Sequence, residues 1–113
     1  MTYEEFAEFS KRIFLNCLCV LEEKGKGYSK KDGDRLEHFY EAAAKLNISA
    51  GEALMGMKVK HTVCIDDIVR KVAFGEPVKR HTVDEKFTDE INYLILLRAL
   101  IEEEGIFQAE SEE

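Results

Sequence analysis

The sequence predicts an all-α protein, a compact bundle of four to five helices with a central or interface-forming C-terminal helix. Apolar residues recur at helical spacing in several segments, so that each forms one apolar face. A Ser/Thr-x-x-Glu capping box begins at Thr2, at Ser49 and at Thr82, and helical periodicity follows each of them. No segment shows the alternation of apolar and polar residues that is typical of a strand.

Length and composition indicate a single domain that folds without disulfide bonds. With 113 residues and a hydrophobic share of 45%, the chain can bury one core. We expect residues 1–106 to form one helical domain and residues 107–113 to form an acidic flexible tail. Cys17 and Cys19 lie two positions apart on a predicted helix and point in different directions, so they suit neither a disulfide nor a metal clip.

The first two helices are predicted over residues 3–23 and 34–46. Apolar residues at helical spacing form the main face of the first helix: Phe6, Phe9, Ile13, Cys17 and Val20. Gly25 and Gly27 are expected to end this helix. The second helix has its own apolar face: Leu36, Phe39, Tyr40, Ala43 and Leu46. Asn47 can take the left-handed position that closes it.

Two further helices are predicted over residues 50–60 and 63–74. The first is expected to bury Ala53, Leu54 and Met57. The second is expected to bury Ile65, Ile68, Val69 and Val72. Gly75 favours a helix end, and Pro77 cannot continue a helix, so a loop should follow.

The last helix, over residues 83–104, is predicted to be the centre of the bundle or part of a subunit interface. Its segment Ile91–Ile101 reads INYLILLRALI and is apolar nearly all the way round. Neighbouring helices of modest length would cover such a helix incompletely. We therefore expect a homodimer or a higher oligomer.

A polar stripe on this last helix is the first candidate site. Glu85, Asp89 and Asn92 are spaced i, i+4, i+7 and share one helix face. The carboxylates of Glu85 and Asp89 can bind a hard cation such as Mg²⁺, which in turn binds substrate phosphates. The alternative is that Glu85 only caps the helix and Asp89 is solvated. Asn92 favours a site, because it adjoins the apolar segment and a buried amide needs partners.

A second candidate is the junction of the third and fourth predicted helices, at Lys60 and His61. If the chain turns there, both residues lie near a helix N-terminus, where backbone donors favour an anion. The alternative is a solvated lysine and a structural histidine.

Composition and motifs exclude several classes of function. The net charge of −7 disfavours general binding to nucleic acid or to anionic membranes. The sequence contains no nucleophile elbow, phosphate-cradling glycine loop, thiolate metal site or zinc-protease helix. Its acidic start lacks the cationic opening of a signal peptide, and no apolar run is long enough to span a bilayer. We expect a cytoplasmic protein.

Several segments together resemble a known group of proteins. They are Tyr28 in a polar linker, RLEHFYEAAAKL (Arg35–Leu46), KHTVCIDDIV (Lys60–Val69) and DEKFTDEINYLILLRALI (Asp84–Ile101). In this order they resemble small helical bacteriophage proteins akin to the nucleotide-modification-associated domain family. The resemblance implies an all-α fold in the host cytoplasm and a role connected with nucleotides. It also points to the family-type polar positions: Arg35, Lys60, His61, Asp66, Glu85, Asp89, Asn92 and Tyr93.

A weaker resemblance is to the MazG-type all-α nucleotide pyrophosphohydrolases. Those enzymes bind Mg²⁺ through an EExxE pattern on one helix and ExxD on another. Here Glu37 with Glu41, and Glu85 with Asp89, have a different spacing, and no EExxE is present. This departure speaks against catalysis.

Three hypotheses about function follow. The first is an accessory protein that sequesters a nucleotide or nucleotide-like signal, with Arg35, Lys60, His61, Asn92 and Tyr93 as ligand-binding residues and a counter-defence role. The second is a Mg²⁺-dependent nucleotide phosphohydrolase with Glu85 and Asp89 as metal ligands, which needs at least a third carboxylate. The third is a protein–protein inhibitor of a host enzyme such as a CRISPR nuclease. We expect binding rather than catalysis.

Overall fold

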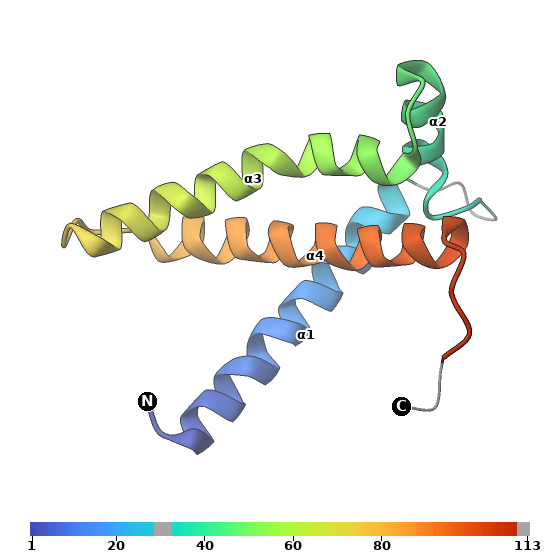
Figure 1. The fold of residues 1–113 in the computed structure, drawn as a ribbon. Helices are drawn as coiled ribbons and strands as arrows, with labels where there is room; N and C mark the ends of the chain where they lie inside the picture. Colours follow the sequence, from blue (N-terminus) through green and yellow to red (C-terminus); the bar gives the residue numbers. More distant parts are fainter. Residues whose placement is uncertain (29–32, 111–113) are drawn as a thin grey trace.

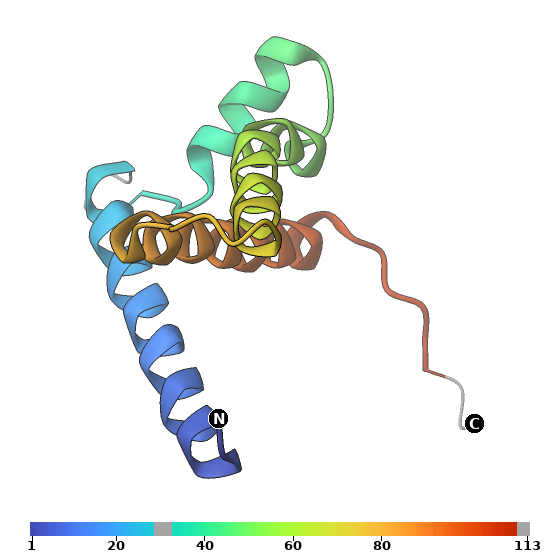
Figure 2. The same cartoon turned by 90° about the vertical axis from the view of Figure 1, so that its left-hand side faces the viewer.

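Four helices make up the fold that the computed structural model describes over residues 1–28 and 33–110. They are α1 (Tyr3–Tyr28), α2 (Glu37–Leu46), α3 (Ala50–Ala73) and α4 (Arg80–Glu104), and these ranges contain no strand (Figure 1). α3 and α4 run antiparallel and side by side, α1 crosses α4, and α2 packs on α3 (Figures 1 and 2). The prediction of an all-α bundle with a central C-terminal helix is confirmed.

The core lies where α2, the start of α3 and the end of α4 meet. Its buried residues are Leu36, Phe39, Ala43, Ala50, Ala53, Leu54 and Leu100. Complete burial of a side chain such as Phe39 or Leu54 stabilises the fold by about 1.5–3 kcal/mol relative to exposure. At the edge of this core the Tyr40 hydroxyl donates a hydrogen bond of 2.7 Å to Glu103, which ties α2 to the end of α4. This contact with a carboxylate raises the pKa of Tyr40 to about 12.

Two of the three expected capping boxes are confirmed. The Thr2 hydroxyl accepts from the backbone N–H of Glu5, whose carboxylate accepts from the backbone N–H of Thr2. Ser49 and Glu52 make the same reciprocal pair at the start of α3. Asn47, with φ of 57°, closes α2 in the left-handed conformation as expected.

The end expected at Gly75 for the helix predicted over residues 63–74 is also confirmed, as the end of α3. α3 ends at Ala73, and Gly75 follows with φ of 72°, a conformation that a glycine adopts without strain. The backbone N–H of Glu76 donates back to the Lys71 carbonyl, so an otherwise unpaired carbonyl of the last turn is satisfied.

The predicted break between two helices at Lys60 and His61 is wrong, because α3 is continuous from Ala50 to Ala73. The sequence offers no glycine or proline between Met57 and Phe74 to interrupt it. Contacts with α4 hold the middle of α3 in place. The Thr62 hydroxyl donates to the Glu90 carboxylate at 3.1 Å.

Two other boundaries differ from the prediction. α4 begins at Arg80, and its N-cap residue, Lys79, makes no side-chain cap, so the expected capping box of Thr82 and Glu85 is wrong. The loop after Gly75 is short, and the antiparallel return of the chain places Thr82 and Glu85 inside the helix. α1 continues to Tyr28, so Gly25 does not end it. The reason for a glycine at this position is a contact with Arg35, described below.

Beyond α4 the described residues, 105–110, carry no regular secondary structure and are exposed. The rest of the expected tail, residues 111–113, lies outside the described residues. Among the described residues, no helix combines the length and the apolar character needed to cross a membrane.

Candidate functional site

A pocket of about 240 Å³ lies at the junction of all four helices. α1 contributes Leu21 and Lys24, and the segment leading into α2 contributes Arg35. The remaining lining residues come from α2, α3 and α4: His38, Phe39, Met57, Asp89, Asn92, Tyr93 and Leu96. The wall is mostly apolar and aromatic, with a small number of charged and amide groups. This composition is typical of a small-molecule site.

Asn92 is the most deeply buried polar residue of this wall. Its side chain comes from the middle of α4, and the residue is only 6% exposed. The Nδ2 group donates a hydrogen bond of 3.0 Å to the backbone carbonyl of Cys17 on α1. The Oδ1 atom is buried and has no hydrogen-bond partner within residues 1–28 and 33–110. A buried amide oxygen without a partner costs free energy, and a ligand that donates a hydrogen bond would recover it.

Arg35 also lines this pocket and carries an unpaired donor. Its Nη1 atom is buried and finds no hydrogen-bond partner in the described part of the chain. The side chain passes close to α1 at Gly25, where a Cβ atom would lie 2.8 Å from the Arg35 Nε atom. Glycine at this position therefore makes room for the guanidinium. The turn before α2 is fixed as well, because the Leu36 backbone N–H donates to Asp34 at 2.8 Å.

Asp89 links α1, α3 and α4 beside the pocket. Its carboxylate forms an ion pair of 3.0 Å with Lys24 of α1, and its side chain is 11% exposed. The other carboxylate oxygen lies 3.7 Å from Nδ1 of His61 on α3, which is too far for a hydrogen bond. Burial lowers the pKa of His61, and the Asp89 carboxylate offsets only part of this effect. We therefore treat His61 as neutral near pH 7.

Aromatic rings form the walls of the pocket. The rings of His38 and Phe39 lie with centroids 4.0 Å apart, and the Tyr93 ring lies 5.1 Å from that of His61. Burial lowers the pKa of His38, and the nearby Arg35 cation lowers it further. Neutral rings in an apolar wall suit contact with a flat, uncharged part of a ligand.

The structure brings together some of the residues expected from the sequence. Arg35, Asn92, Tyr93 and Asp89 line the pocket. His61 lies directly behind it, beside Asp89 and Tyr93.

Two expected residues lie elsewhere. Lys60 is exposed and lines a separate shallow groove on α3, and no helix begins beside it in the sequence because α3 is continuous through this residue. Glu85 is on the surface, where it pairs with His81 at 3.6 Å and Lys86 at 3.8 Å. The polar stripe on α4 is thus divided between the pocket and the surface.

A metal site at Glu85 and Asp89 stays a prediction. Each carboxylate already contacts a cationic or imidazole side chain. Within the described ranges, no group of three or more His, Cys, Asp and Glu residues is placed to hold a metal ion.

Several lining residues are not expected from the sequence, notably Lys24, His38 and Phe39. Lys24 falls just beyond the first predicted helix, because Gly25 and Gly27 indicate a helix end there. If that helix is extended, helical spacing places Lys24 on the same face as Cys17 and Val20. Phe39 is expected in the core, and it also forms part of the pocket wall.

Comparisons of this chain with protein-family models, with curated proteins and with solved structures give no match. The resemblance to nucleotide-modification-associated phage proteins therefore stays a prediction that depends on the segments quoted above. Any function assigned to the chain depends on the residues of the pocket themselves.

Proposed function

We propose that the four-helix pocket binds a small nucleotide-like ligand and sequesters it without chemical conversion. The observation that carries this proposal is the presence of two unsatisfied polar groups on residues that line one pocket. Within the described residues, the Arg35 Nη1 donor and the Asn92 Oδ1 acceptor are buried and lack partners. A ligand that has both an anionic acceptor and an N–H donor would satisfy them together.

The charged groups favour an anionic part on the ligand. Arg35 presents a guanidinium, which binds phosphate or carboxylate oxygens through its planar set of donors. Lys24 lies on the same wall, and Asp89 already compensates its charge. The pocket therefore has room for about one additional negative charge, which suits a monoanionic group or a phosphodiester better than a triphosphate.

The walls and the size favour a single flat ring system. Phe39, Tyr93 and Leu96 offer apolar and aromatic surface to a nucleobase, while Asn92 Oδ1 can accept from its exocyclic amino group or ring N–H. At about 240 Å³ the pocket lies just below the roughly 300–1,000 Å³ that is usual for ligand sites. A nucleoside or mononucleotide matches this size better than a dinucleotide does.

The residues that line the pocket support binding of the ligand rather than its hydrolysis. Metal-dependent phosphohydrolysis uses several convergent carboxylates, and Asp89 is the one carboxylate in the lining of this pocket as far as the chain is described. Together with the resemblance to phage proteins, this makes sequestration of a nucleotide signal, in a counter-defence role, our proposed biological function.

Thermal shift against nucleosides, nucleoside monophosphates, triphosphates and cyclic mononucleotides tests the proposal. A ligand at a hundred times its dissociation constant should stabilise the protein by about 2.7 kcal/mol. The Arg35→Gln variant should lose most of this stabilisation for the anionic ligands, because the unpaired guanidinium is gone. The matched control is Arg98→Gln, since Arg98 is exposed on the surface of α4, where it contacts Glu102 and Phe107 and does not line the pocket.

Two outcomes would contradict the proposal. One is the absence of a shift with every compound of the panel. The other is an equal loss of stabilisation in the Arg35 and Arg98 variants, which would place the bound anion outside the pocket. Quantitative recovery of the unchanged nucleotide after incubation would separate sequestration from hydrolysis.

A further inference from the structure

The first half of α1 carries an apolar face that none of the other described helices covers. Phe6 and Phe9 lie on the same helix face as Ile13 and Cys17, which packs on α4 further along. Cys17 is buried, whereas Phe6 is 58% exposed and Phe9 is 40% exposed. Figures 1 and 2 show why, because α1 crosses α4 with its second half and its first half projects away from the bundle.

The hydrogen bonds described between α1 and α4 also lie in the second half of α1. The side-chain hydrogen bonds that join α1 to α4 within residues 1–28 and 33–110 begin at Asn16, which donates to Thr88 at 3.0 Å. The radius of gyration is 17.1 Å, against about 13 Å for a globular domain of this length. A helix segment without tertiary contacts is only marginally stable in water. The first four turns of α1 therefore need a partner surface.

The apolar area on this face of α1 is comparable with the largest exposed patch of a typical monomer. Three large side chains on or beside the face are 40–88% exposed: Tyr3, Phe6 and Phe9. With about 200 Å² for each side chain, they leave on the order of 370 Å² of apolar surface in contact with water. The largest patch on a monomer is usually about 300–600 Å² and is often functional. A stable interface removes about 800 Å² per partner, so the polar flanks of this face must contribute as well.

The order of charges along α1 favours a second copy in the antiparallel orientation. Glu4, Glu5 and Glu8 precede Lys11 and Arg12. Glu5 and Arg12 are seven residues apart, so they lie on the same flank of the Phe6–Ile13 face. In an antiparallel pair about a two-fold axis near Phe9, like flanks meet and Glu5 lies beside Arg12 of the partner subunit. In a parallel pair unlike flanks meet, which would place Glu5 beside Ser10 of the partner subunit, without an opposite charge.

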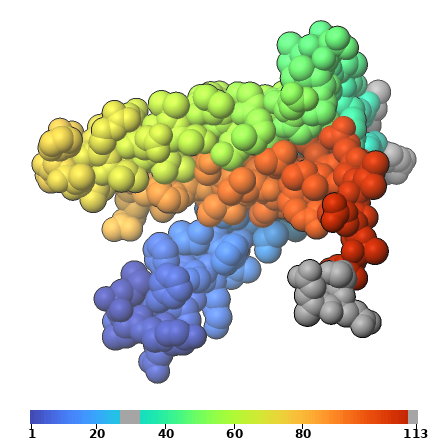
Figure 3. Space-filling model, viewed as in Figure 1, coloured from blue at the N-terminus to red at the C-terminus, as the bar shows by residue number. Residues whose placement is uncertain are grey.

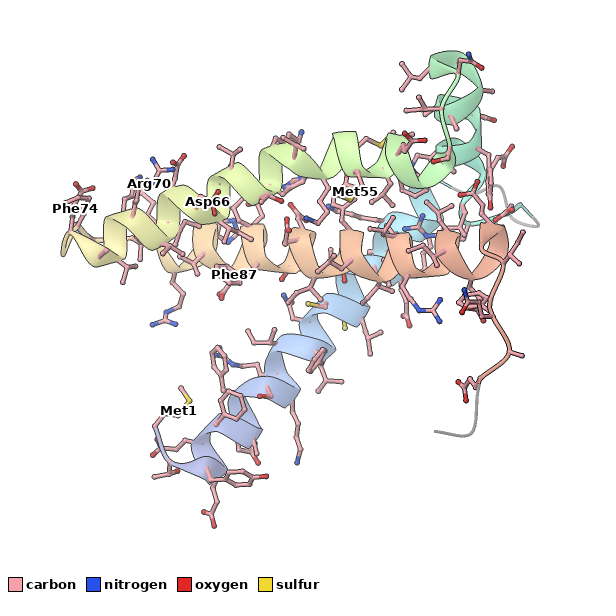
Figure 4. The ribbon with its side chains drawn as sticks, in the orientation of Figure 1. Met1, Met55, Asp66, Arg70, Phe74 and Phe87 are labelled. Atoms are coloured by element: carbon pink, nitrogen blue, oxygen red, sulfur yellow. The ribbon has the colours of Figure 1, made fainter. Side chains whose placement is uncertain are left out.

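The structure also provides space beside the first half of α1. The space-filling view shows this half standing apart from α4 (Figure 3). A cavity of about 620 Å³ opens between α1 and α4. Three apolar residues, Ile13, Val20 and Phe87, line it together with eight polar or charged residues. Phe87 lies on the side of α4 that faces α1 (Figure 4). A second helix can therefore lie along the first half of α1 without meeting α4.

From these observations we infer that the first half of α1 is a self-association surface, on which two copies pair antiparallel about a two-fold axis near Phe9. In this arrangement Phe6 and Phe9 of each copy pack against Phe9 and Ile13 of the partner subunit. Ion pairs between Glu5 and Arg12 of the partner subunit fix the direction. This surface is independent of the proposed ligand site, since Phe6, Phe9, Glu5 and Arg12 do not line the four-helix pocket.

Sedimentation equilibrium of the full chain, over concentrations up to about 100 µM, tests the interface. The wild type should be a dimer. Replacing both Phe6 and Phe9 by Ser should weaken dimerisation on the order of a hundredfold or more, because both central apolar anchors are removed. The matched control replaces Val72 and Phe74 by Ser. These residues are at least as exposed and lie at the far end of α3 (Figure 4 labels Phe74), so this variant should remain a dimer.

A charge exchange tests the direction of pairing. Glu5→Lys alone places a second cation beside Arg12 of the partner subunit, and Arg12→Glu alone places a second carboxylate beside Glu5. Each variant should therefore dimerise on the order of tenfold more weakly than the wild type. Mixing the two variants should restore tight association as a heterodimer, since opposite charges then meet at both ends. The control Glu22→Lys, at the other end of α1, should not change association.

These experiments can overturn either the self-association of α1 or its antiparallel orientation. A monomeric wild type, or equal weakening by the α1 and α3 serine variants, overturns the inference. Single charge variants that dimerise as tightly as the wild type, or a mixture that stays as weak as its components, overturn the antiparallel orientation. Circular dichroism of each variant, with helix content close to that of the wild type, identifies a change in association rather than in folding.

Discussion

Asn92 shows how one side chain can join two helices and still keep an unpaired acceptor. Its amide nitrogen is bonded to the Cys17 carbonyl, which holds α1 against α4, while its amide oxygen is left without a partner in the described structure. The sequence predicted a site here because an amide next to an apolar segment needs partners. It could not show that one end of the amide is used between helices, since that contact joins residues 75 positions apart.

His61 is the residue whose protonation should couple to stability. Because burial lowers its pKa in the folded state below the ordinary value of 6.5, the unfolded chain binds the proton more readily. Stability should therefore be highest above pH 6.5 and should fall as the pH drops from 6.5 through the lowered pKa. Urea unfolding at several pH values between about 5 and 8 measures this dependence.

The matched variants are His61→Gln and His81→Gln. His61→Gln should reduce the pH dependence, because it removes the group whose proton affinity changes on folding. His81 is 92% exposed at its side chain, so its replacement should leave the pH dependence as in the wild type. An unchanged slope for His61→Gln would show that other groups cause the acid sensitivity.

At the scale of the helices, local sequence signals predicted where helices begin and end better than they predicted where a helix continues without a break. The Thr2 and Ser49 capping boxes, Asn47 and Gly75 all act as expected, because each satisfies backbone groups within a few residues of itself. The predicted break at Lys60 failed for a non-local reason. Contacts of Thr62 and Lys58 with Glu90 on α4 support a continuous α3, and no pattern within one segment shows a partner on another helix.

A substitution at Gly25 tests why α1 has a glycine inside the helix, beyond the end that the sequence predicted. In a helix interior, Gly→Ala normally stabilises by about 1 kcal/mol. At this position the new Cβ atom would lie 2.8 Å from the Arg35 Nε atom, and the flexible guanidinium would have to move. Gly25→Ala should therefore keep or raise the free energy of unfolding and at the same time weaken binding of the nucleotide that gives the largest thermal shift.

Gly56→Ala on α3 is the control for this change. A Cβ atom there has nothing within 4 Å, so this variant should gain stability and keep its affinity. Calorimetric titration compares the two affinities, and urea unfolding compares the two stabilities. Equal nucleotide affinities in both variants would show that the contact between Gly25 and Arg35 does not affect ligand binding.

At the scale of the whole molecule, α3 and α4 form an antiparallel pair, and α1 crosses α4 so that its first half projects away from the bundle (Figure 1). The sequence predicted a bundle and an oligomer, but it attributed the incomplete coverage to the apolar last helix. In the structure α4 is flanked by α1 and α3, and the larger uncovered surface belongs to α1. Helical periodicity reveals that a face is apolar. Periodicity cannot tell whether that face packs against the same chain or against another one, since an apolar face is buried in the same way in either case.

The crossing of α1 over α4 also allows the separation of these two helices to be measured through the protein's own cysteines. Cys17 is only 1% exposed at this crossing, and burial raises the pKa of its thiol, whereas Cys19 two positions later is open to solvent. A thiol-specific reagent should therefore modify Cys19 at once and Cys17 only when the crossing separates. Peptide mass spectrometry over time resolves the two rates, and equal rates would mean that the crossing is not a persistent contact. A delay at Cys17 would give the lifetime of the closed crossing in the unmodified protein, without an introduced label.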